Sequence, residues 1–148
     1  MLSRTSEYAL RAMVCLTRHV DEWPIPGPKI AEETGIPRKY LSNVLGQLVR
    51  AGVLVATPGV GGGFRMVRRP QEVRLHEILT PFEPALGPSR PCPFGNEICG
   101  DANPCAGHAR WKSVRDAYGE FLRTTSIQDV SVGQNGASGN GSGKRERQ

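Results

Sequence analysis

Three cysteines and a histidine lie close together in a stretch of the chain that is rich in proline and glycine. Cys92, Cys99 and Cys105 are separated by six and five residues, and His108 follows three residues after the last of them. A segment interrupted so often by proline and glycine forms neither a core strand nor a buried helix. Packing therefore does not explain the cysteines, and their grouping predicts a loop that folds around a metal centre.

Two kinds of metal centre use thiolates in this way, iron–sulfur clusters and structural zinc. Structural zinc typically binds cysteine pairs that are two to four residues apart, and the chain contains no such pair. The longer gaps favour an open loop around a larger inorganic group, so an iron–sulfur cluster of two or four irons is our hypothesis. A zinc site, a disulfide with one spare thiol, and unrelated free thiols are the alternatives.

The beginning of the chain bears on whether disulfides form. Residues 1–20 carry four charged side chains and no continuous apolar run, so they do not resemble a signal peptide. No segment of the sequence is long and apolar enough to span a membrane. We therefore expect a cytoplasmic protein with reduced thiols. Cys15, alone on a predicted amphipathic helix, is interpreted as a small buried apolar residue.

The first half of the chain has the pattern of a winged helix-turn-helix domain. Apolar spacing, with glycines and prolines at the ends, predicts helices over residues 3–20, 29–34 and 38–51. Residues 53–57 and 64–67 read as short strands around a glycine-rich turn, which predicts a hairpin. Two short helices joined by a tight turn are typical of helix-turn-helix proteins, in which such a hairpin forms the wing. The predicted fold class is mainly α with a small β-hairpin wing.

Two further helices and a tail are predicted in the second half. A short helix over residues 75–82 precedes the cysteine loop, and helical spacing of apolar residues returns over residues 106–123. We expect this late helix to cross a helix of a second copy, and packing on its own winged domain is the alternative. From residue 132 onward, small, polar and charged residues without an apolar period predict disorder.

The 148 residues leave room for one domain and an appendage. The predicted parts are the winged helix-turn-helix DNA-binding domain (1–83), a cysteine-rich cluster-binding loop (84–108), a long C-terminal dimerisation helix with its end (109–130), and a disordered tail (131–148).

The third predicted helix has the features of a DNA-reading helix. Its aliphatic positions face inward and leave polar and basic side chains outside, which are the types that contact phosphate oxygens and base edges. A polar outer face alone is typical of any surface helix, but here it is joined to a helix-turn-helix and a basic wing. The residues predicted to contact DNA are Arg38, Lys39, Tyr40, Ser42 and Asn43 in this helix, Lys29 in the preceding helix, and Arg65 and Arg68 in the wing.

The charge distribution agrees with an anionic partner. The net charge is +5, and lysine and arginine outnumber aspartate and glutamate by 11 to 7 in residues 1–80. An excess of basic residues in the part that contains the helix-turn-helix indicates a double-stranded DNA operator as partner.

Three further residues carry weaker signals. Gly46 lies inside the third predicted helix, where glycine costs about 1 kcal/mol relative to alanine, and the close approach of a neighbouring helix would explain it. His19 and His76 lie in helical contexts that favour surface roles. Since no acid–base pair or nucleophile arrangement is visible, we do not expect an enzyme.

Several segments carry a pattern that is more specific together than any of them is alone. They are residues 2–12, 30–41, 48–54, 61–64, the cysteine loop and residues 121–130. In this order they resemble the Rrf-two family of bacterial winged-helix regulators over residues 1–130. The resemblance implies a homodimer whose long C-terminal helices cross, with the cysteines between the dimer helix and the DNA-binding domain.

The resemblance also implies roles for individual residues. The three loop cysteines correspond to cluster ligands. His108 stands where some members place a histidine as the fourth ligand, and Glu7 stands where others supply a carboxylate from the second subunit. The chain departs from the family pattern in a first cysteine gap that is one residue longer, and in Pro58, where the wing usually has an arginine.

These observations predict a homodimeric regulator that represses or activates promoters. It would sense redox state, nitric oxide or iron–sulfur status through a cysteine-ligated iron–sulfur cluster. A winged-helix repressor that senses thiols or a small ligand without any metal is the alternative. The visible absorbance of anaerobically purified protein separates the two.

Overall fold

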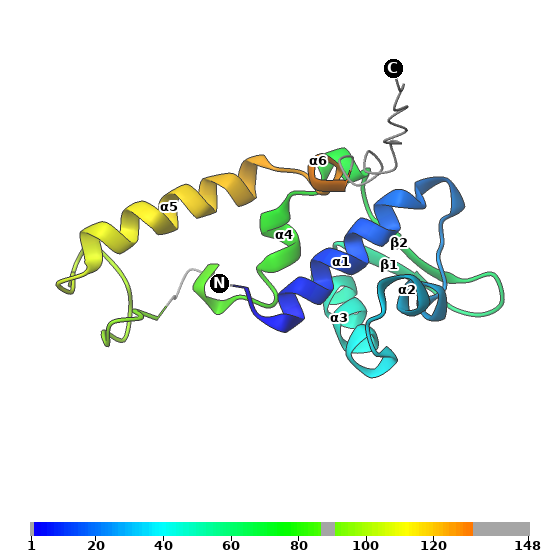
Figure 1. Cartoon of the computed structure of the whole chain (residues 1–148), viewed down its shortest axis with the longest axis horizontal. Helices are drawn as coiled ribbons and strands as arrows, with labels where there is room; N and C mark the ends of the chain where they lie inside the picture. The colour runs from blue at the N-terminus through cyan, green and yellow to red at the C-terminus, as the bar shows by residue number, and fades with distance from the viewer. Residues whose placement is uncertain (1, 87–90, 132–148) are drawn as a thin grey trace, which may run out of the picture.

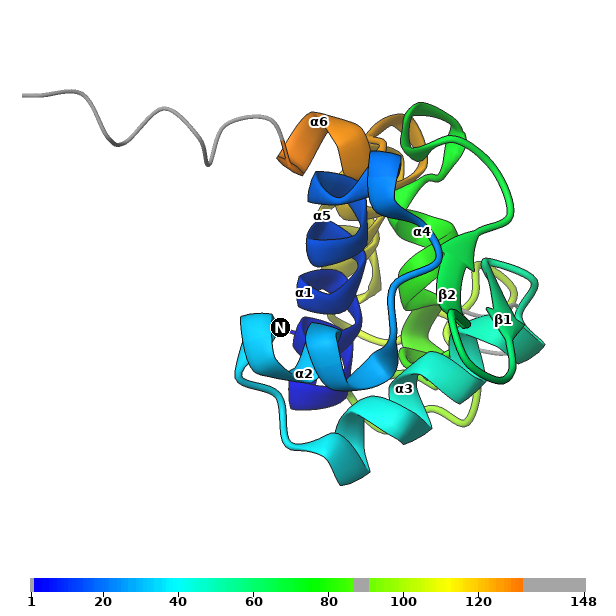
Figure 2. The same cartoon turned by 90° about the vertical axis from the view of Figure 1, so that its right-hand side faces the viewer.

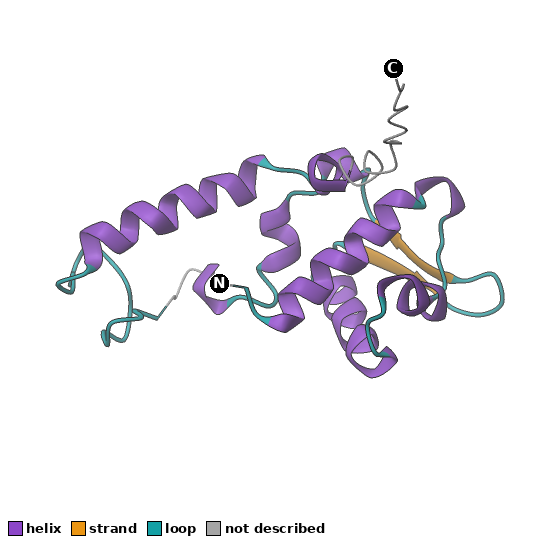
Figure 3. Ribbon diagram, in the orientation of Figure 1, coloured by secondary structure: helices purple, strands orange, loops and turns teal. Residues whose placement is uncertain are grey.

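The chain folds into a helical body from which a hairpin and one long helix extend (Figures 1 and 3). The structure is a computed structural model that describes residues 2–86 and 91–131. Its helices are α1 (Arg4–Arg18), α2 (Gly27–Thr34), α3 (Arg38–Arg50), α4 (Leu75–Leu79), α5 (His108–Thr124) and α6 (Ile127–Ser131), and its strands are β1 (Leu54–Thr57) and β2 (Gly63–Met66). Short 3-10 turns lie at Val20–Glu22, Pro70–Glu72 and Pro84–Leu86. The predicted fold class, mainly α with a two-stranded hairpin, is confirmed.

Helix α1 is the centre of the body. Its apolar face was predicted from the spacing of Ala9, Ala12, Met13, Leu16 and Val20. The first four are fully buried, but Val20 lies beyond the end of the helix and is 42% exposed, so its assignment to this face was wrong. The helix contacts α2, α3, α4 and α6, which surround it in Figure 2. Ser3 begins it as an N-cap, with its hydroxyl accepting from the backbone N–H of Ser6. One amphipathic helix thus organises the core.

Helices α2 and α3 form the predicted helix-turn-helix. Gly35 ends α2 in the left-handed conformation, with φ of 70°, which glycine adopts without the cost that a Cβ imposes. The four aliphatic residues predicted to face inward on α3, namely Leu41, Val44, Leu45 and Leu48, are all buried. The polar side of α3 is therefore left on the surface.

The wing is an antiparallel hairpin in which Leu54 pairs with Met66 and Thr57 with Gly63. It is fastened to the body by a short bridge, where Ile25 exchanges two backbone hydrogen bonds with Phe64 at 2.8 and 2.9 Å. A Cβ on Gly63 would lie 2.3 Å from the backbone of Ile25, so glycine permits this close approach. The hairpin turn and the cysteine loop lie at opposite ends of the molecule (Figure 1).

The long helix α5 joins the body only at its C-terminal end. Leu122 is 1% exposed and Tyr118 packs against the same core, whereas the first turns of α5 extend away from the body (Figure 1). After α5 the chain returns to α4, since Leu75 donates to Thr125 and Ile127 donates to Val73 through the backbone. We had considered that α5 packs on its own winged domain. The structure shows such packing for the C-terminal end of this helix.

The predicted boundaries differ from the observed ones in a few places. The short helix expected over 75–82 ends at Leu79, and the strands begin and end within one residue of the prediction. Ser131, placed in the predicted tail, is a buried residue that ends α6. The rest of that tail, residues 132–148, lies outside the described residues.

Candidate metal-binding loop and nucleic-acid interface

The cysteine loop is held in shape by its own turns and by α5. Within residues 91–107 the structure has neither helix nor strand. Gly95 donates to the carbonyl of Cys92 at 3.3 Å, and the side-chain amide of Asn96 donates to the carbonyl of Asn103 at 2.8 Å. The ring of Phe94 meets Trp111 of α5 edge-on, with centroids 6.1 Å apart. These contacts fold the loop back on the start of α5.

The four predicted ligands come together as two pairs. The Sγ atoms of Cys92 and Cys105 are 3.6 Å apart, and the Sγ of Cys99 lies 3.9 Å from Nδ1 of His108. Cys92, Cys99 and His108 are each less than 9% exposed, while Cys105 is half-buried. Among the described residues, no three potential ligand atoms of the loop lie within 4.8 Å of one another. The arrangement is therefore two pairs and not one convergent point.

A carboxylate orients the histidine. Asp101 accepts from Nε2 of His108 at 2.8 Å, and Lys112 donates to the same carboxylate at 2.9 and 3.0 Å. The hydrogen bond from His108, followed by that from Lys112, lowers the pKa of Asp101 to about 2. An ionised Asp101 places the proton of the imidazole on Nε2, which leaves the lone pair of Nδ1 directed toward Cys99.

Hydrogen-bond donors approach the sulfur atoms of two cysteines. The guanidinium of Arg115 on α5 donates to Sγ of Cys99 at 3.0 Å. At Cys92, the backbone N–H of Phe94 donates to Sγ at 3.4 Å and is the main cause of a lowered pKa. Nε of Arg115 is buried and has no hydrogen-bond partner among the described residues. Thiolates are the form that binds metals, so the lowered pKa of Cys92 favours that chemistry.

The donor set and the space beside it fit an inorganic group held by thiolates. A cavity of about 260 Å³ lies between the loop, α5 and residues 83–86, and its wall includes Cys92 and Cys99 but neither Cys105 nor His108. Three thiols and one imidazole are ligand types shared by iron–sulfur clusters and zinc. Glu7, the other candidate for a fourth ligand, lies exposed on α1 and outside the loop.

Six of the eight residues predicted to contact DNA lie on helices α2 and α3. Five of them, Arg38, Lys39, Tyr40, Ser42 and Asn43, are exposed on the first turns of α3. Lys29 is half-buried on α2, with Nζ 3.8 Å from a carboxylate oxygen of Glu22. The predicted surface exposure of the five side chains on α3 is therefore confirmed.

The two predicted wing arginines differ from each other. Arg65 is exposed on β2 and donates to the carbonyl of Met66 at 3.3 Å. Arg68 follows the hairpin and forms an ion pair with Glu77 of α4, while donating to the carbonyl of Glu72 at 3.0 Å. The turn between the strands, residues 58–62, carries no charged side chain. Basic charge on the wing thus comes from its strand and not from its tip.

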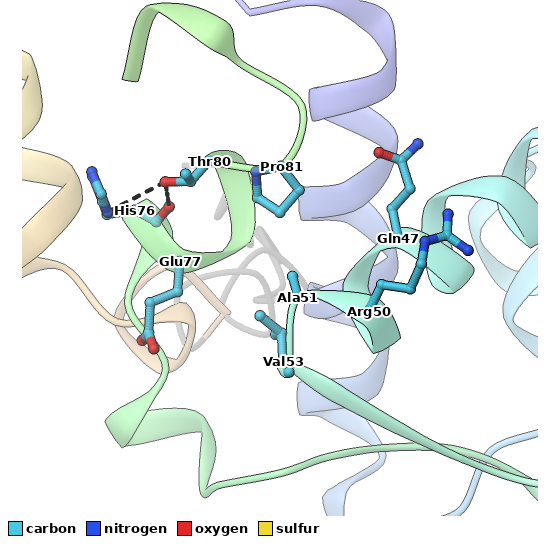
Figure 4. A pocket seen from close by; sticks show the side chains of 9 residues that line it. Gln47, Arg50, Ala51, Val53, His76, Glu77, Thr80 and Pro81 are labelled. Atoms are coloured by element: carbon cyan, nitrogen blue, oxygen red, sulfur yellow. Dashed lines mark hydrogen bonds between the residues drawn. The ribbon is translucent and has the colours of Figure 1, made fainter. Parts of the chain in front are cut away.

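An open hollow of about 650 Å³ lies where the end of α3 meets α4 (Figure 4). Gln47 and Arg50 border it from α3, and His76, Glu77 and Thr80 border it from α4. The hydroxyl of Thr80 donates to the carbonyl of His76 at 2.6 Å and lies 3.4 Å from Nδ1 of the same residue, as the dashed lines of Figure 4 indicate. The hollow contains none of the predicted cluster ligands.

A second group of potential metal ligands was missed by the sequence reasoning. Cys15, His19 and Glu33 lie with one ligand atom each within 4.8 Å of one another. Burial is the main cause that raises the pKa of the Cys15 thiol to about 12, and Glu33 adds to it. The i, i+4 spacing of the cysteine and the histidine was the available signal, but Glu33 comes from α2 and needed the tertiary packing.

The family model Rrf2, described as iron-dependent transcriptional regulator, matches residues 2–132. The chain belongs to the Rrf2 family. The family resemblance stated from the sequence is confirmed, and so is the expectation that the protein is not an enzyme, because the related proteins are transcriptional regulators.

The similar proteins include regulators from several bacteria. The chain is 28% identical over 131 residues to the HTH-type transcriptional regulator IscR of Aliivibrio salmonicida, covering 88% of this chain and 77% of that protein. It is also 28% identical over 129 residues to IscR of Photorhabdus laumondii, covering 87% of this chain and 77% of that protein.

Two solved structures share the fold. That of T. potens IscR has a TM-score of 0.74 at 22% identity, over 95% of this chain and 93% of the other. That of CymR, the global cysteine regulator of B. subtilis, has a TM-score of 0.73 at 26% identity, over 89% and 96%. None of the helices in the described part of the chain is long and apolar enough to cross a membrane.

Proposed function

We propose that this Rrf2-family transcriptional regulator binds operator DNA as a homodimer and carries an iron–sulfur cluster held by Cys92, Cys99, Cys105 and His108. The observation that carries the proposal is the pairing of the four ligands. In a two-iron cluster the four protein ligands are shared between the two irons. A single zinc ion would instead draw all four ligands to one point.

The distances within the pairs support a two-iron cluster. Two thiolates bonded at about 2.3 Å to one tetrahedral metal lie about 3.7 Å apart. The Cys92 and Cys105 sulfurs are separated by 3.6 Å, which suits one metal atom. Cys99 and Nδ1 of His108, at 3.9 Å, form the second pair. We therefore favour two irons over four.

The residues around the ligands give the site its proposed sensitivity. Bound there, the cluster would supply an iron centre that responds to oxidants or nitric oxide. Since residues 91–107 have no helix or strand, ligation by the three cysteines would add to the turns and the ring contact that hold the loop. His108 is also the first residue of α5, so a change in its ligation reaches that helix directly.

The exposed face of α5 supports association with a second copy. Val114 and Phe121 are seven residues apart, thus on the same side of the helix, and are 54% and 50% exposed. Large apolar side chains that remain exposed along one face favour a protein partner. The first turns of α5 extend away from the body (Figure 1), which gives a second α5 room to cross them.

DNA recognition is assigned to α3 and the wing. The exposed side chains on the first turns of α3 would enter the major groove, and Arg65 would contact the phosphate backbone. In a dimer, two such helices would read two halves of a palindromic operator. The dimer would have one arrangement with the cluster ligated at the start of α5 and another without it. Ligation would then change operator affinity only as far as these two arrangements differ in their affinity for the operator.

The test is purification of the full-length protein without oxygen, followed by absorbance spectra and iron and sulfide counting. We expect a coloured protein with two irons and two sulfides per chain, and loss of the colour in Cys92→Ala, Cys99→Ala and Cys105→Ala. His108→Ala and Glu7→Gln, compared side by side, identify the fourth ligand. Colourless protein with one zinc per chain would contradict the proposal.

A variant that alters the orientation of His108 tests its role as a ligand more specifically. Asp101→Asn removes the anionic partner of Nε2, and partners of this kind typically contribute about 10–100-fold to metal affinity. We expect iron retention to fall in Asp101→Asn and to be unchanged in Glu97→Gln, which alters an exposed carboxylate of the same loop.

A cluster-free thiol sensor is the second candidate. It is supported by the 3.6 Å contact between the Cys92 and Cys105 sulfurs and by the similarity to the cysteine regulator CymR. On this hypothesis, anaerobically purified protein contains no iron, and mild oxidation links Cys92 to Cys105. Mass spectrometry of the peptides before and after oxidation distinguishes it from the cluster hypothesis.

A further inference from the structure

The end of α1 and the end of α2 bring a thiol, an imidazole and a carboxylate together, far in sequence from the cysteine loop. Cys15 lies in the last turn of α1, and His19 is the residue that ends this helix. Glu33 of α2 faces both of them. Its Oε2 atom lies 3.3 Å from Sγ of Cys15 and 2.6 Å from Nε2 of His19.

These three groups are a donor set that zinc takes in proteins. Zinc binds thiolate sulfur at about 2.3 Å and imidazole nitrogen or carboxylate oxygen at about 2.0–2.2 Å, in tetrahedral geometry. Ligand atoms around one such ion are therefore about 3.3–3.6 Å apart. The 3.3 Å contact of Glu33 with Cys15 falls in this range, whereas its 2.6 Å contact with His19 is a hydrogen-bond distance that must lengthen when an ion binds.

The surroundings of the three groups also suit a metal site. Nδ1 of His19 is paired with the carboxylate of Glu22, which directs Nε2 toward Cys15 and Glu33. A carboxylate on the second nitrogen is the usual support for a histidine that binds a metal. Cys15 is 4% exposed, whereas the side chains of His19 and Glu33 are 24% and 36% exposed. An ion can therefore enter from solvent past His19 and Glu33, and Cys15 is the most buried of the three ligands.

We propose that Cys15, His19 and Glu33 bind a divalent transition-metal ion, zinc by preference, and that the bound ion fastens α1 to α2. Three protein ligands leave one position for water, as in zinc sites with exchangeable ligands. On binding, the S–H bond of Cys15 is replaced by a sulfur–metal bond and its proton leaves to solvent. Nε2 of His19 gives up its proton to bind the ion, the ring keeps its proton on Nδ1 toward Glu22, and no oxidation state changes. Since α2 is the first helix of the helix-turn-helix, the ion would fix that unit on the central helix.

A hydrogen-bonded network without metal is the competing explanation of the same contacts. The thiol of Cys15 then donates to Glu33, which also accepts from His19. The two explanations differ in whether Cys15 forms a bond to an added metal. Cobalt(II) is the probe, because it replaces zinc and its thiolate complexes absorb light.

The three loop cysteines must be replaced so that Cys15 is the only thiol in the tested chain. Cys92→Ser, Cys99→Ser and Cys105→Ser are combined in the full-length chain, which we expect to fold because none of these three residues belongs to the hydrophobic core. Titration with cobalt should give one equivalent per chain with a thiolate-to-metal absorption band. Adding Cys15→Ala to this chain should abolish the band.

Variants of the other two ligands test the rest of the site. Glu33→Gln and His19→Ala should each weaken cobalt binding at least tenfold, and Glu22→Gln by about 10–100-fold. Glu32→Gln is the matched control, because it removes an exposed carboxylate of the same helix that is not in the group. Absence of a band in the triple-serine chain, or its survival in Cys15→Ala, would overturn the proposal.

Stability measurements provide a readout that does not depend on colour. A ligand that binds only the folded state raises the unfolding temperature by mass action. Zinc should therefore raise the unfolding temperature of the triple-serine chain and of its Glu32→Gln derivative, but not that of its Glu33→Gln derivative. An equal shift in all three would mean that zinc binds elsewhere.

Discussion

At the scale of single residues, the structure changes the explanation of Gly46. The close approach of a neighbouring helix was expected, but the position where a Cβ would stand meets only the guanidinium of Arg50, at 3.6 Å. That distance is an ordinary van der Waals contact with a flexible side chain. The expectation was wrong, and nothing in the packing of α3 requires glycine at this position.

Gly46→Ala is therefore expected to stabilise the protein. Alanine should raise the free energy of unfolding by about 1 kcal/mol, the difference in helix propensity between the two residues. Gly35→Ala is the matched comparison, because Gly35 has a φ of 70° and alanine there is strained. Chemical denaturation of both variants measures the difference. A loss of stability in Gly46→Ala would point to a packing role that this arrangement does not contain.

The candidate sites show which residues a sequence can predict. Cys92, Cys99 and Cys105 were found because their spacing in a loop is visible in one dimension. Arg115 was missed, because a lone arginine on a helix gains meaning only when α5 turns it toward the sulfur of Cys99. Glu33 was missed for the same reason, since its partners lie on another helix.

At the scale of elements, the start of α1 is tied to the segment that leads into the cysteine loop. The carboxylate of Glu83 accepts from the backbone N–H of Ser3 at 2.9 Å and from the hydroxyl of Ser6 at 2.5 Å. Helix periodicity predicted α1 and its buried face, but not this link over some eighty residues. The link connects the N-terminus of the central helix to the chain that carries the ligands.

The same carboxylate gives a prediction for the pH dependence of stability. Burial opposes ionisation of Glu83, but the hydrogen bonds from Ser6 and Ser3 outweigh it and lower its pKa below the usual 4.5. The ionised group therefore stabilises the fold above pH 4.5, and this contribution is lost as the pH falls through the lowered pKa. Glu83→Gln should cost about 1.5–3 kcal/mol at neutral pH, the usual contribution of hydrogen bonds to a charged group.

Urea denaturation across a pH series checks this expectation. The difference between wild type and Glu83→Gln should shrink on acidification, because both side chains are then neutral. Glu120→Gln, an exposed change on α5, should follow the wild type throughout. A difference that stays constant with pH would assign the effect to packing and not to charge.

At the scale of the whole molecule, α5 divides into an end that belongs to the core and a beginning that does not. Tyr118 and Leu122 pack on the body, so charged substitutions there would unfold it. Val114→Glu and Phe121→Glu alter the exposed face instead and should convert the proposed dimer to monomers, because a buried charge without a partner is costly.

Sedimentation measures that outcome, with circular dichroism to show that the variants remain folded. Arg123→Glu is the control, because it lies on the opposite side of α5 from Val114. Dimers in both test variants would mean that another surface mediates association.

Recognition of DNA gives the last prediction, in which α3 and the wing are separated by their salt dependence. Asn43→Ala should cost about 1–3 kcal/mol on the specific operator and relax its sequence preference, as expected for a lost base contact. Arg65→Ala should weaken binding to all sequences and reduce the slope of log affinity against log salt by about 1, because one phosphate contact is lost. Arg68→Ala should change this slope less, since its guanidinium is already paired with Glu77. Operator and random DNA, titrated over a salt series, distinguish these effects, and unchanged affinity and selectivity in the Asn43 and Arg65 variants would show that DNA is bound by another face.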